Sequence, residues 1–446
     1  MIYIFVSGGS FGIEEMISSS GPGLTLILLM TLPFLWALPM ALVSAELGAA
    51  LPDGGFYHWT RRAIGKFWGF QSAWWWTLAT LVDTSLYVVL AASYLQGVLG
   101  FDQTVFYVTC WSIIGLFAAI NILGLRFVAL SSTVFSLLII SPFLILIAVG
   151  LANWQFNPFL PIVPPEQNLL GGDGALILGL SVGLWMYSGY ESMSTLSGEI
   201  ENPQNVIPKA LMLALPFVAL MYLLPTLASL AAFGQWERFG VAGVGGEVSF
   251  IDIGRALGGS YLGYALLASA LLGNLALYLD YMGSCARPLY VLADDGLFPA
   301  FLLRVSPRFG TPVAAIVAVA AVNCVLVVGP FQSLVVIDVI LMIAAYALIL
   351  ISAVRLRVRE PTMARPFRVP LGTGGLALLI VPPLALIGLV IYLAIVDRSM
   401  TIGGTSELSV LGISIGWYGA VSIFALASGP LIYCCVSRGK VKAPLQ

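Results

Sequence analysis

The sequence predicts an all-α polytopic membrane protein, and three observations support this fold class. The 446-residue chain is 60% hydrophobic, only 9% of its residues are charged, and its mean hydropathy is +1.00. Soluble globular domains are about half apolar and about one quarter charged. Apolar segments of about 20 residues, the length that crosses a hydrocarbon core, follow one another along the chain. The loops between them are short, so we expect one membrane domain and no soluble domain.

Twelve membrane spans are expected. Residues 210–235 and 312–337 contain no charged residue, which makes the spans there the clearest. The expected cores of all spans are 2–19, 24–50, 68–97, 104–123, 127–152, 174–198, 207–233, 257–283, 312–329, 332–354, 373–396 and 409–436.

Lysine and arginine predict the orientation, because they are enriched in cytoplasmic loops. With the N-terminus inside, only Arg238, Arg255 and Arg398 of the 19 basic residues fall outside. Both termini are therefore expected in the cytoplasm, with the protein in the plasma (cell inner) membrane. The six residues before residue 7 would span only about 9 Å of helix, which is less than the roughly 15 Å from the membrane midplane to its inner surface. We therefore also expect the native chain to begin upstream of Met1.

Composition excludes several function classes. The net charge is −2 and no long basic tract occurs, so nucleic acid is not an expected partner. His58 is the single histidine, which removes His-based metal sites and catalytic triads. The five cysteines fit neither a metal site nor a disulfide framework. We therefore expect no metal, no cofactor and no enzymatic activity.

Two glycine-containing breaks interrupt apolar segments about 180 residues apart. Glycine costs a helix about 1 kcal/mol relative to alanine, and backbone groups freed inside a bilayer find no water to bond. Two such segments in matching places are typical of the substrate site of a secondary transporter. A glycine-rich packing face is the alternative for residues 7–12. The first break consists of Ser7, Gly8, Gly9, Ser10, Phe11 and Gly12, and the second of Tyr187, Ser188, Gly189, Tyr190 and Glu191.

The helix ends at these breaks predict the ligand. The N–H groups and positive dipole end of a half-helix beginning after residue 12 suit a carboxylate, and free carbonyl groups before each break suit an ammonium group. Phe11, Trp185, Tyr187 and Tyr190 flank the breaks and offer aromatic faces for cation–π contacts. A zwitterion or an amine is therefore the expected ligand.

Acidic side chains inside the spans are the second group of candidates. A charge that faces lipid costs several kcal/mol, and no lysine or arginine lies mid-span to pair with these acids. Each is expected to meet a cationic substrate, carry a proton or accept backbone hydrogen bonds. The acids within spans are Glu46, Asp83, Glu191, Asp280 and Asp338, and Glu14 and Glu15 lie within the first span or at its outer end.

Position separates these acids. Glu191 at the second break, Asp83 and Asp338 are the candidates for substrate binding or proton transfer. Residues 74–76, three tryptophans, and Tyr87 could form an aromatic wall beside Asp83. Glu46 lies near the inner end of its span, where a structural or gating role is expected. Asp280 is expected either to pair with Arg287 or to bind substrate.

Five motifs, in order, resemble those of the amino acid–polyamine–organocation transporters over nearly the whole chain. They are the glycine break at 7–12, AELG at 45–48 with PDGGFY at 52–57, GEIENP at 198–203 with IPKA at 207–210, Arg287 with YVLADDGLFP at 290–299 and FGTP at 309–312, and RPFRVP at 365–370. The resemblance implies a LeuT-like fold with 12 transmembrane helices. Two inverted five-helix repeats, 1–152 and 174–354, would be followed by two additional helices within 373–436, with helices 1 and 6 discontinuous.

Within this family the chain resembles most the polyamine carriers of plants and protozoa. FGIE at 11–14, FWGFQ at 67–71 and SMSTL at 192–196 carry the likeness, and Asp83, Glu191 and Asp338 fall where those carriers have acids. Phe5 and Met40 stand where glutamates are expected, and losing two carboxylates should weaken binding of a polycation.

The expected function is a secondary active amino acid permease, coupled to protons and working by alternating access. Polyamine uptake, for example of putrescine or spermidine, is the alternative. A polyamine would need several accessible carboxylates and no helix end that binds a carboxylate. A non-transporting subunit on this scaffold should have lost its break residues or gained a domain, and the sequence shows neither change. A major-facilitator fold should show a long central loop, and the sequence shows none.

Overall fold

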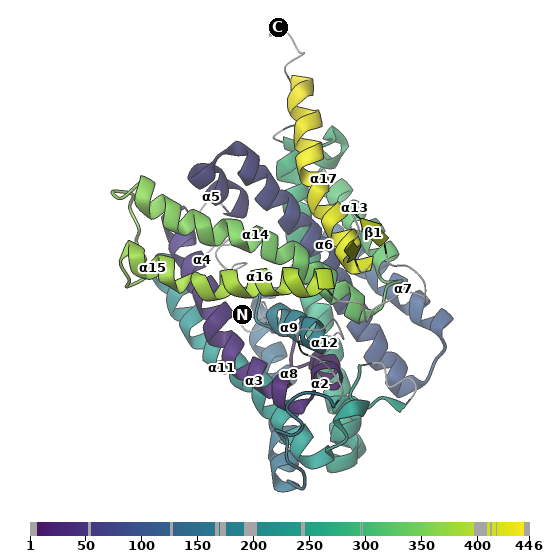
Figure 1. The fold of residues 1–446 in the computed structure, drawn as a ribbon. Coiled ribbons are helices and arrows are strands. Elements are labelled where there is room, and N and C mark those ends of the chain that lie inside the picture. The colour runs from purple at the N-terminus through teal and green to yellow at the C-terminus, as the bar shows by residue number, and fades with distance from the viewer. Residues whose placement is uncertain are drawn as a thin grey trace.

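The computed structural model of the chain describes residues 7–51, 55–124, 128–165, 169, 175–190, 203–241, 246–294, 296, 298–396, 408–410, 413–415 and 417–440. Helices make up most of these residues (Figure 1). The elements of the first half are α2 (Ile13–Ser20), α3 (Pro22–Leu32), the π-helix η1 (Pro33–Ala37), α4 (Leu38–Ala50), α5 (Gly55–Ile64), α6 (Lys66–Leu99), α7 (Gln103–Ile122), α8 (Val128–Ala152) and α9 (Ala175–Met186).

The second half continues the helical pattern and adds one short hairpin. Its elements are α11 (Pro203–Phe233), η3 (Trp236–Arg238), α12 (Phe250–Asp294), η5 (Ala300–Leu303), α13 (Val313–Leu326), α14 (Phe331–Arg359), α15 (Thr373–Leu379), α16 (Val381–Val396), β1 (Leu408–Val410), β2 (Ile413–Ile415) and α17 (Trp417–Lys440). The antiparallel strands β1 and β2 pair Leu408 with Ile415.

Seven helices of the described part are long and apolar enough to cross a membrane, among them Pro22–Ala50, Lys66–Leu99 and Phe331–Arg359. Four shorter apolar helices accompany them. A helical, multi-pass membrane protein is therefore confirmed. The expected span at 409–436 was wrong at its start, because residues 408–410 and 413–415 form paired strands and the helix begins at Trp417. Alternating serines and aliphatic residues in this stretch favour a strand, which hydropathy alone does not distinguish from a helix.

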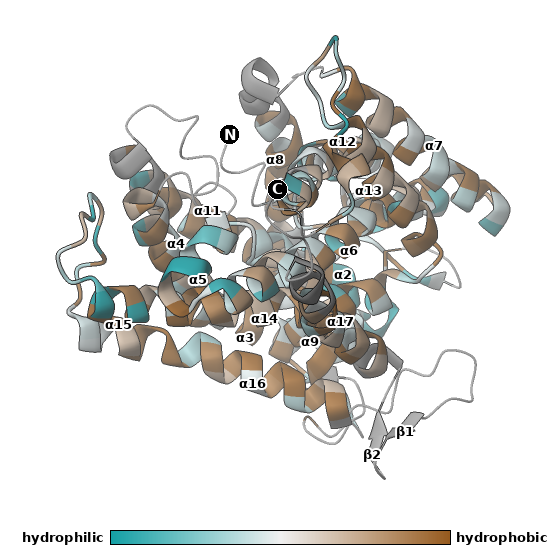
Figure 2. Cartoon of the chain, turned by 90° about the horizontal axis from the view of Figure 1, so that it is seen from above, coloured by the Kyte–Doolittle hydropathy of each residue, from teal (hydrophilic) through white to brown (hydrophobic). Residues whose placement is uncertain are grey.

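The helices divide into a buried centre and an apolar periphery. The long helices α6 and α14 pack against each other, and most side chains of both are buried. Peripheral helices expose large apolar side chains instead: Leu213 on α11 is 76% exposed and Phe424 on α17 is 75% exposed. Figure 2 shows hydrophobic colouring along the peripheral α16, whereas hydrophilic colouring gathers on α5. Apolar residues on the outer surface are what a lipid environment requires.

The two expected breaks lie next to each other. Residues 7–12 are not helical, and Gly9 and Gly12 have φ values of 107° and 94°, which favour glycine. Helix α2 begins after them and packs against α9, which ends at Met186 before Gly189 at φ 97°. Residues 1–6 and 191–202 lie outside the described residues, and so do Phe5, Glu191 and the expected upstream start of the chain.

Candidate functional site

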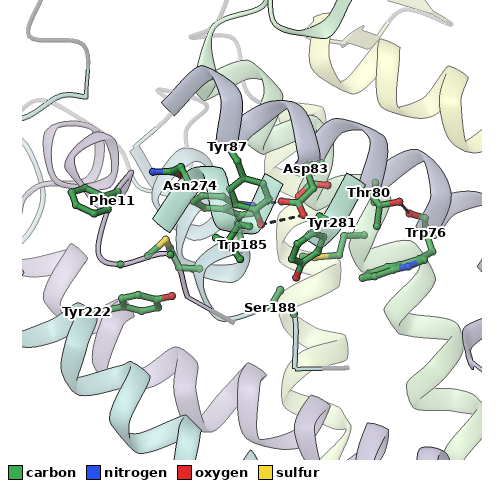
Figure 3. A pocket seen from close by; sticks show the side chains of 18 of the residues that line it. Phe11, Trp76, Thr80, Asp83, Tyr87, Trp185, Ser188, Tyr222, Asn274 and Tyr281 are labelled. Carbon is green, nitrogen blue, oxygen red and sulfur yellow. Dashed lines mark hydrogen bonds between the residues drawn. The ribbon is translucent and has the colours of Figure 1, made fainter. Parts of the chain in front are cut away.

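A buried cavity lies where the two breaks meet the central helices. Its empty volume is about 600 Å³, part of it open to solvent. Side chains reach it from α6, α9, α11, α12 and α14 (Figure 3). The residues that line it are Gly8, Gly9, Phe11, Trp76, Ala79, Thr80, Asp83, Tyr87, Trp185, Met186, Ser188, Gly189, Tyr222, Asn274, Leu277, Tyr281, Asp338, Met342 and Tyr346.

Helical spacing explains which side chains meet in the cavity. Trp76, Thr80, Asp83 and Tyr87 follow one another on α6 at intervals of three or four residues, which places them on one face of the helix. On α14, Asp338, Met342 and Tyr346 follow one another at intervals of four residues and form a second such face. The contact between α6 and α14 brings the two faces together across the cavity.

The cavity contains two carboxylates. Asp83 accepts hydrogen bonds from Trp185 Nε1 at 2.7 Å and from the Tyr87 hydroxyl at 3.2 Å. No described side chain or backbone group donates a hydrogen bond to Asp338, which is only 2% exposed. No lysine or arginine is among the lining residues of the described part. The cavity is therefore acidic and has unused acceptor capacity, which suits a ligand that carries an N–H-bearing cation.

Aromatic rings surround the carboxylates. The ring of Tyr87 lies 5.9 Å from that of Trp185 and 5.6 Å from that of Tyr281, between centroids. Trp76 and Tyr346 form a second pair, 5.7 Å apart. In Figure 3, Phe11 and Trp76 lie at opposite ends of the labelled group. Electron-rich ring faces beside buried carboxylates attract an ammonium group.

The backbone of the first break lies at the cavity wall because glycine permits close packing. A Cβ at Gly8 would lie 2.7 Å from Leu277 Cδ1 and 3.2 Å from the carbonyl carbon of Gly273, both on α12. Gly9 N donates to Ser7 Oγ at 3.2 Å. Trp36 of η1 donates from Nε1 to Ser188 Oγ at 3.2 Å and so links η1 to the second break.

The start of α2 is already occupied by protein groups. Gly12 N donates to Glu14 Oε2 and to the Tyr94 hydroxyl, each at 2.9 Å. Glu14 is fully buried. The carboxylate expected at this helix end is thus one of the protein's own side chains, and Gly12 N is not left over for a ligand.

The structure brings together eight of the expected site residues: Gly8, Gly9, Phe11, Asp83, Trp185, Ser188, Gly189 and Asp338 line the cavity. Ser7, Ser10, Gly12, Tyr187 and Tyr190 belong to the breaks and are buried, but they do not line the cavity. Ser10 Oγ donates to the Met221 carbonyl at 2.5 Å, and the Tyr187 hydroxyl donates to the Leu29 carbonyl at 2.8 Å.

Sequence reasoning missed Tyr222, Asn274, Tyr281 and Tyr346, which line the cavity from α11, α12 and α14. Asn274 offered a signal, because an amide inside a long apolar span needs a hydrogen-bonding reason to be there. The three tyrosines offered none, since tyrosines are also common at membrane surfaces.

The other intramembrane acids that the structure describes, Glu14, Glu15, Glu46 and Asp280, are not among the residues that line the cavity. Glu46 was expected to meet a substrate, carry a proton or accept backbone hydrogen bonds, with no basic residue mid-span to pair with it. It also forms an ion pair with the buried Arg357, which lies near the end of α14 rather than mid-span. The side chain of Arg287, the expected partner of Asp280, lies outside the described residues. Among the described residues, no three His, Cys, Asp or Glu side chains gather as a metal site would require.

Comparisons with known proteins identify a family of transporters. A family model described as amino acid permease matches residues 2–432. A polyamine transporter of Oryza sativa subsp. japonica is 35% identical over 408 residues, which cover 88% of this chain and 72% of that protein. A polyamine transporter of Arabidopsis thaliana is 31% identical, with 87% and 78% covered. A methylthioribose transporter of Bacillus subtilis (strain 168) is 26% identical, with 82% and 80% covered.

Proposed function

Because the chain belongs to the amino acid permease family, we propose that it is a secondary transporter of small organic cations and that polyamines are its substrate class. The family and the relatives are transporters rather than enzymes. The observation that carries the substrate class is the cavity with two carboxylates, several aromatic rings and no lysine or arginine among its described lining residues.

The charge balance of the cavity supports a cation. Asp83 and Asp338 would leave two uncompensated negative charges in a desolvated space, and a substrate with ammonium groups would neutralise them. The Trp185 and Tyr87 donors hold the Asp83 carboxylate in place. The Asp338 carboxylate has acceptor sites left for a second ammonium group or for a secondary amine.

Phe5 and Met40, which stand where glutamates were expected, are weaker arguments for an amino acid once the fold is known. Met40 is buried on α4 and is not among the residues that line the cavity, so a methionine there removes no charge from the described site. Phe5 lies outside the described residues. The names of the relatives from rice and Arabidopsis also favour a polyamine.

An amino acid is the second candidate. The backbone of Gly8 and Gly9 lines the cavity and could receive the carboxylate of a zwitterion. The occupied N–H of Gly12 argues against a second anion site at the start of α2. A neutral amino acid would also leave one of the two aspartates unmatched.

The proposed mechanism is proton-coupled alternating access around the two breaks. It assumes the LeuT-like arrangement of 12 helices, with repeats in 1–152 and 174–354 and two additional helices within 373–436. The protein would lie in the cell membrane with both termini in the cytoplasm. Trp185, Ser188 and Gly189 would contact the substrate from the second break, together with Glu191.

Uptake into proteoliposomes tests the substrate class. We expect labelled putrescine and spermidine to accumulate when the outside is more acidic than the inside, and a mixed amino acid panel to accumulate far less. Accumulation of amino acids without polyamines would replace the proposal by the second candidate. Accumulation of neither would contradict the transporter proposal itself.

Variants test the two aspartates. Asp83→Asn and Asp338→Asn each remove one charge while keeping the shape of the side chain. A hydrogen bond to a charged group contributes about 1.5–3 kcal/mol, so each variant should raise the KM for putrescine roughly 10- to 100-fold. Asp102→Asn is the matched control, because Asp102 is an exposed N-cap of α7 and asparagine caps a helix equally well. An unchanged KM in both cavity variants would refute the assignment.

A further inference from the structure

Glu14 is fully buried outside the cavity and bonds to three separate parts of the chain. Its Oε2 accepts the Gly12 N–H at 2.9 Å, and its Oε1 accepts the N–H of Phe250, the first residue of α12, at 3.3 Å. The hydroxyl of Tyr94 on α6 lies 3.0 Å from Oε1 and 2.9 Å from Oε2. Every one of these partners can donate a hydrogen bond, which is the environment of an ionised carboxylate.

Helix ends, rather than a cation, compensate this charge. The carboxylate lies at the N-terminal ends of α2 and α12, whose dipoles favour an anion. No ion pair joins Glu14 to a lysine or arginine of the described residues. The charge is therefore stable only while α2 and α12 remain docked to each other. A separation of the two helices would leave a buried anion without the Phe250 N–H.

Few other titratable groups face this site. Tyr94 faces it from α6, and Glu15 is its neighbour on α2. The nearby η3 contributes Glu237 and the exposed Arg238, whose guanidinium bonds to Gly246 and Gln235. Asp252 on the first turn of α12 bonds to Ser249 and lies 3.7 Å from Arg255. Helices α3 and α9, which also pack on α2, have no titratable side chains.

The Glu14 site is connected to the substrate cavity through Phe11. Phe11 lines the cavity and precedes Gly12, the residue that donates to Glu14. The Phe11 ring also lies 5.2 Å from the ring of Tyr94, edge to face. A substrate that displaces Phe11 would therefore disturb two of the donors that hold the Glu14 charge.

We propose that Glu14 carries the coupling proton, a role that rests on the proposed function. The carboxylate is ionised while α2 is docked on α12. When α2 moves away, Glu14 takes a proton from the water on the side that opens, and the O–H bond forms at the oxygen that loses its backbone donor. Redocking of α2 restores the Phe250 donor, so that Glu14 ionises again and returns the proton to water on the other side.

The test compares Glu14→Gln with wild type in proteoliposomes, using labelled putrescine as the probe. Exchange against internal unlabelled putrescine needs no net proton movement, whereas accumulation driven by a proton gradient does. We expect the variant to exchange putrescine at a rate that no longer depends on pH. A proton gradient should not raise its putrescine accumulation above the level measured without the gradient. A pH-sensitive dye inside the vesicles should report proton entry with substrate for wild type only.

Glu15→Gln is the matched control, since it makes the same change one residue later. The Glu15 carboxylate accepts from Val241 N at 3.2 Å and Gln332 Nε2 at 2.5 Å, and it does not contact Gly12. This control should keep proton-driven accumulation. Equal accumulation by wild type and Glu14→Gln would overturn the proposal. Putrescine transport by wild type without any proton dependence would overturn it too, while leaving the transporter assignment intact; absence of all uptake by wild type would contradict the proposed function instead.

Tyr94→Phe keeps the proposal testable if Glu14→Gln does not fold. It removes one donor from the carboxylate, so the ionised form loses stabilisation and the pH profile of exchange should move toward higher pH. A profile that coincides with that of wild type would refute the role of Glu14.

Discussion

The ion pair of Glu46 with Arg357, beside which Arg365 Nε lies 3.4 Å from Glu46 Oε1, leads to a stability prediction. The two side chains are 4% and 1% exposed, so the charges are removed from water. Glu46 Oε1 accepts Arg357 Nε at 2.7 Å, and Oε2 accepts Arg357 Nη2 and the Val369 N–H, the latter at 2.8 Å. The pair thereby joins α4, the end of α14 and the loop before α15.

Glu46→Gln should destabilise the protein strongly. Removing one partner of a buried ion pair typically costs about 3–5 kcal/mol because the other charge stays buried, which is a roughly 100- to 4000-fold change in the folded-to-unfolded ratio. The Leu371 and Val369 carbonyls would still bond to the Arg357 guanidinium, at 2.5 and 3.0 Å, but they cannot neutralise its charge. Glu46→Gln combined with Arg357→Gln should regain part of the loss.

Thermal unfolding of the purified protein in one detergent is the assay, with the wild type, both single variants and the double variant measured together. The single variants should unfold at clearly lower temperatures than the wild type. The double variant should lose less in unfolding temperature than the sum of the two single losses. Wild-type stability of Glu46→Gln would refute the reasoning. Additive losses would refute it too, because they would mean that the two side chains do not interact.

Two further predictions concern packing and surface charge. Gly273→Ala would press a methyl group against the Gly8 carbonyl oxygen, at a cost of about 1–3 kcal/mol, and should reduce putrescine uptake roughly 5- to 140-fold. Gly388→Ala, where a Cβ meets nothing within 4 Å, should leave uptake unchanged. Arg62→Ala removes a pair whose side chains are 48% and 32% exposed and should cost at most about 1 kcal/mol of stability. The Arg62 hydrogen bond lowers the pKa of Glu360 from 4.5, so melting curves of variant and wild type should differ above pH 4.5 and converge as the pH falls below it.

Several of the helical spans could be predicted closely because hydropathy is a local property. The segment expected at 68–97 is the helix Lys66–Leu99, and the one expected at 104–123 is Gln103–Ile122. The start of the span expected at 409–436 is an exception. Residues 408–415 are as apolar as a span, but 408–410 and 413–415 form paired strands before Trp417, and only the alternating pattern distinguishes the two structures.

The candidate site could be predicted in part. The glycines of the breaks and the acids Asp83 and Asp338 are conspicuous in apolar segments, and the structure places them in one cavity. Tyr222 and Tyr281 could not be distinguished from other membrane tyrosines, because which face of a span points inward depends on its neighbours. Glu14 was visible as an acid in the first span, but its partners were not.

By itself the sequence determined that this chain crosses a membrane many times and that two of its segments contain glycine breaks, since hydropathy and left-handed backbone conformations depend on adjacent residues. Only the tertiary structure decided what each buried charge meets. Glu46 finds Arg357 311 residues later, and Glu14 finds the Phe250 N–H 236 residues later. In a low-dielectric interior the partner determines whether a carboxylate holds the fold together, binds a cation or carries a proton, and no local pattern specifies that partner.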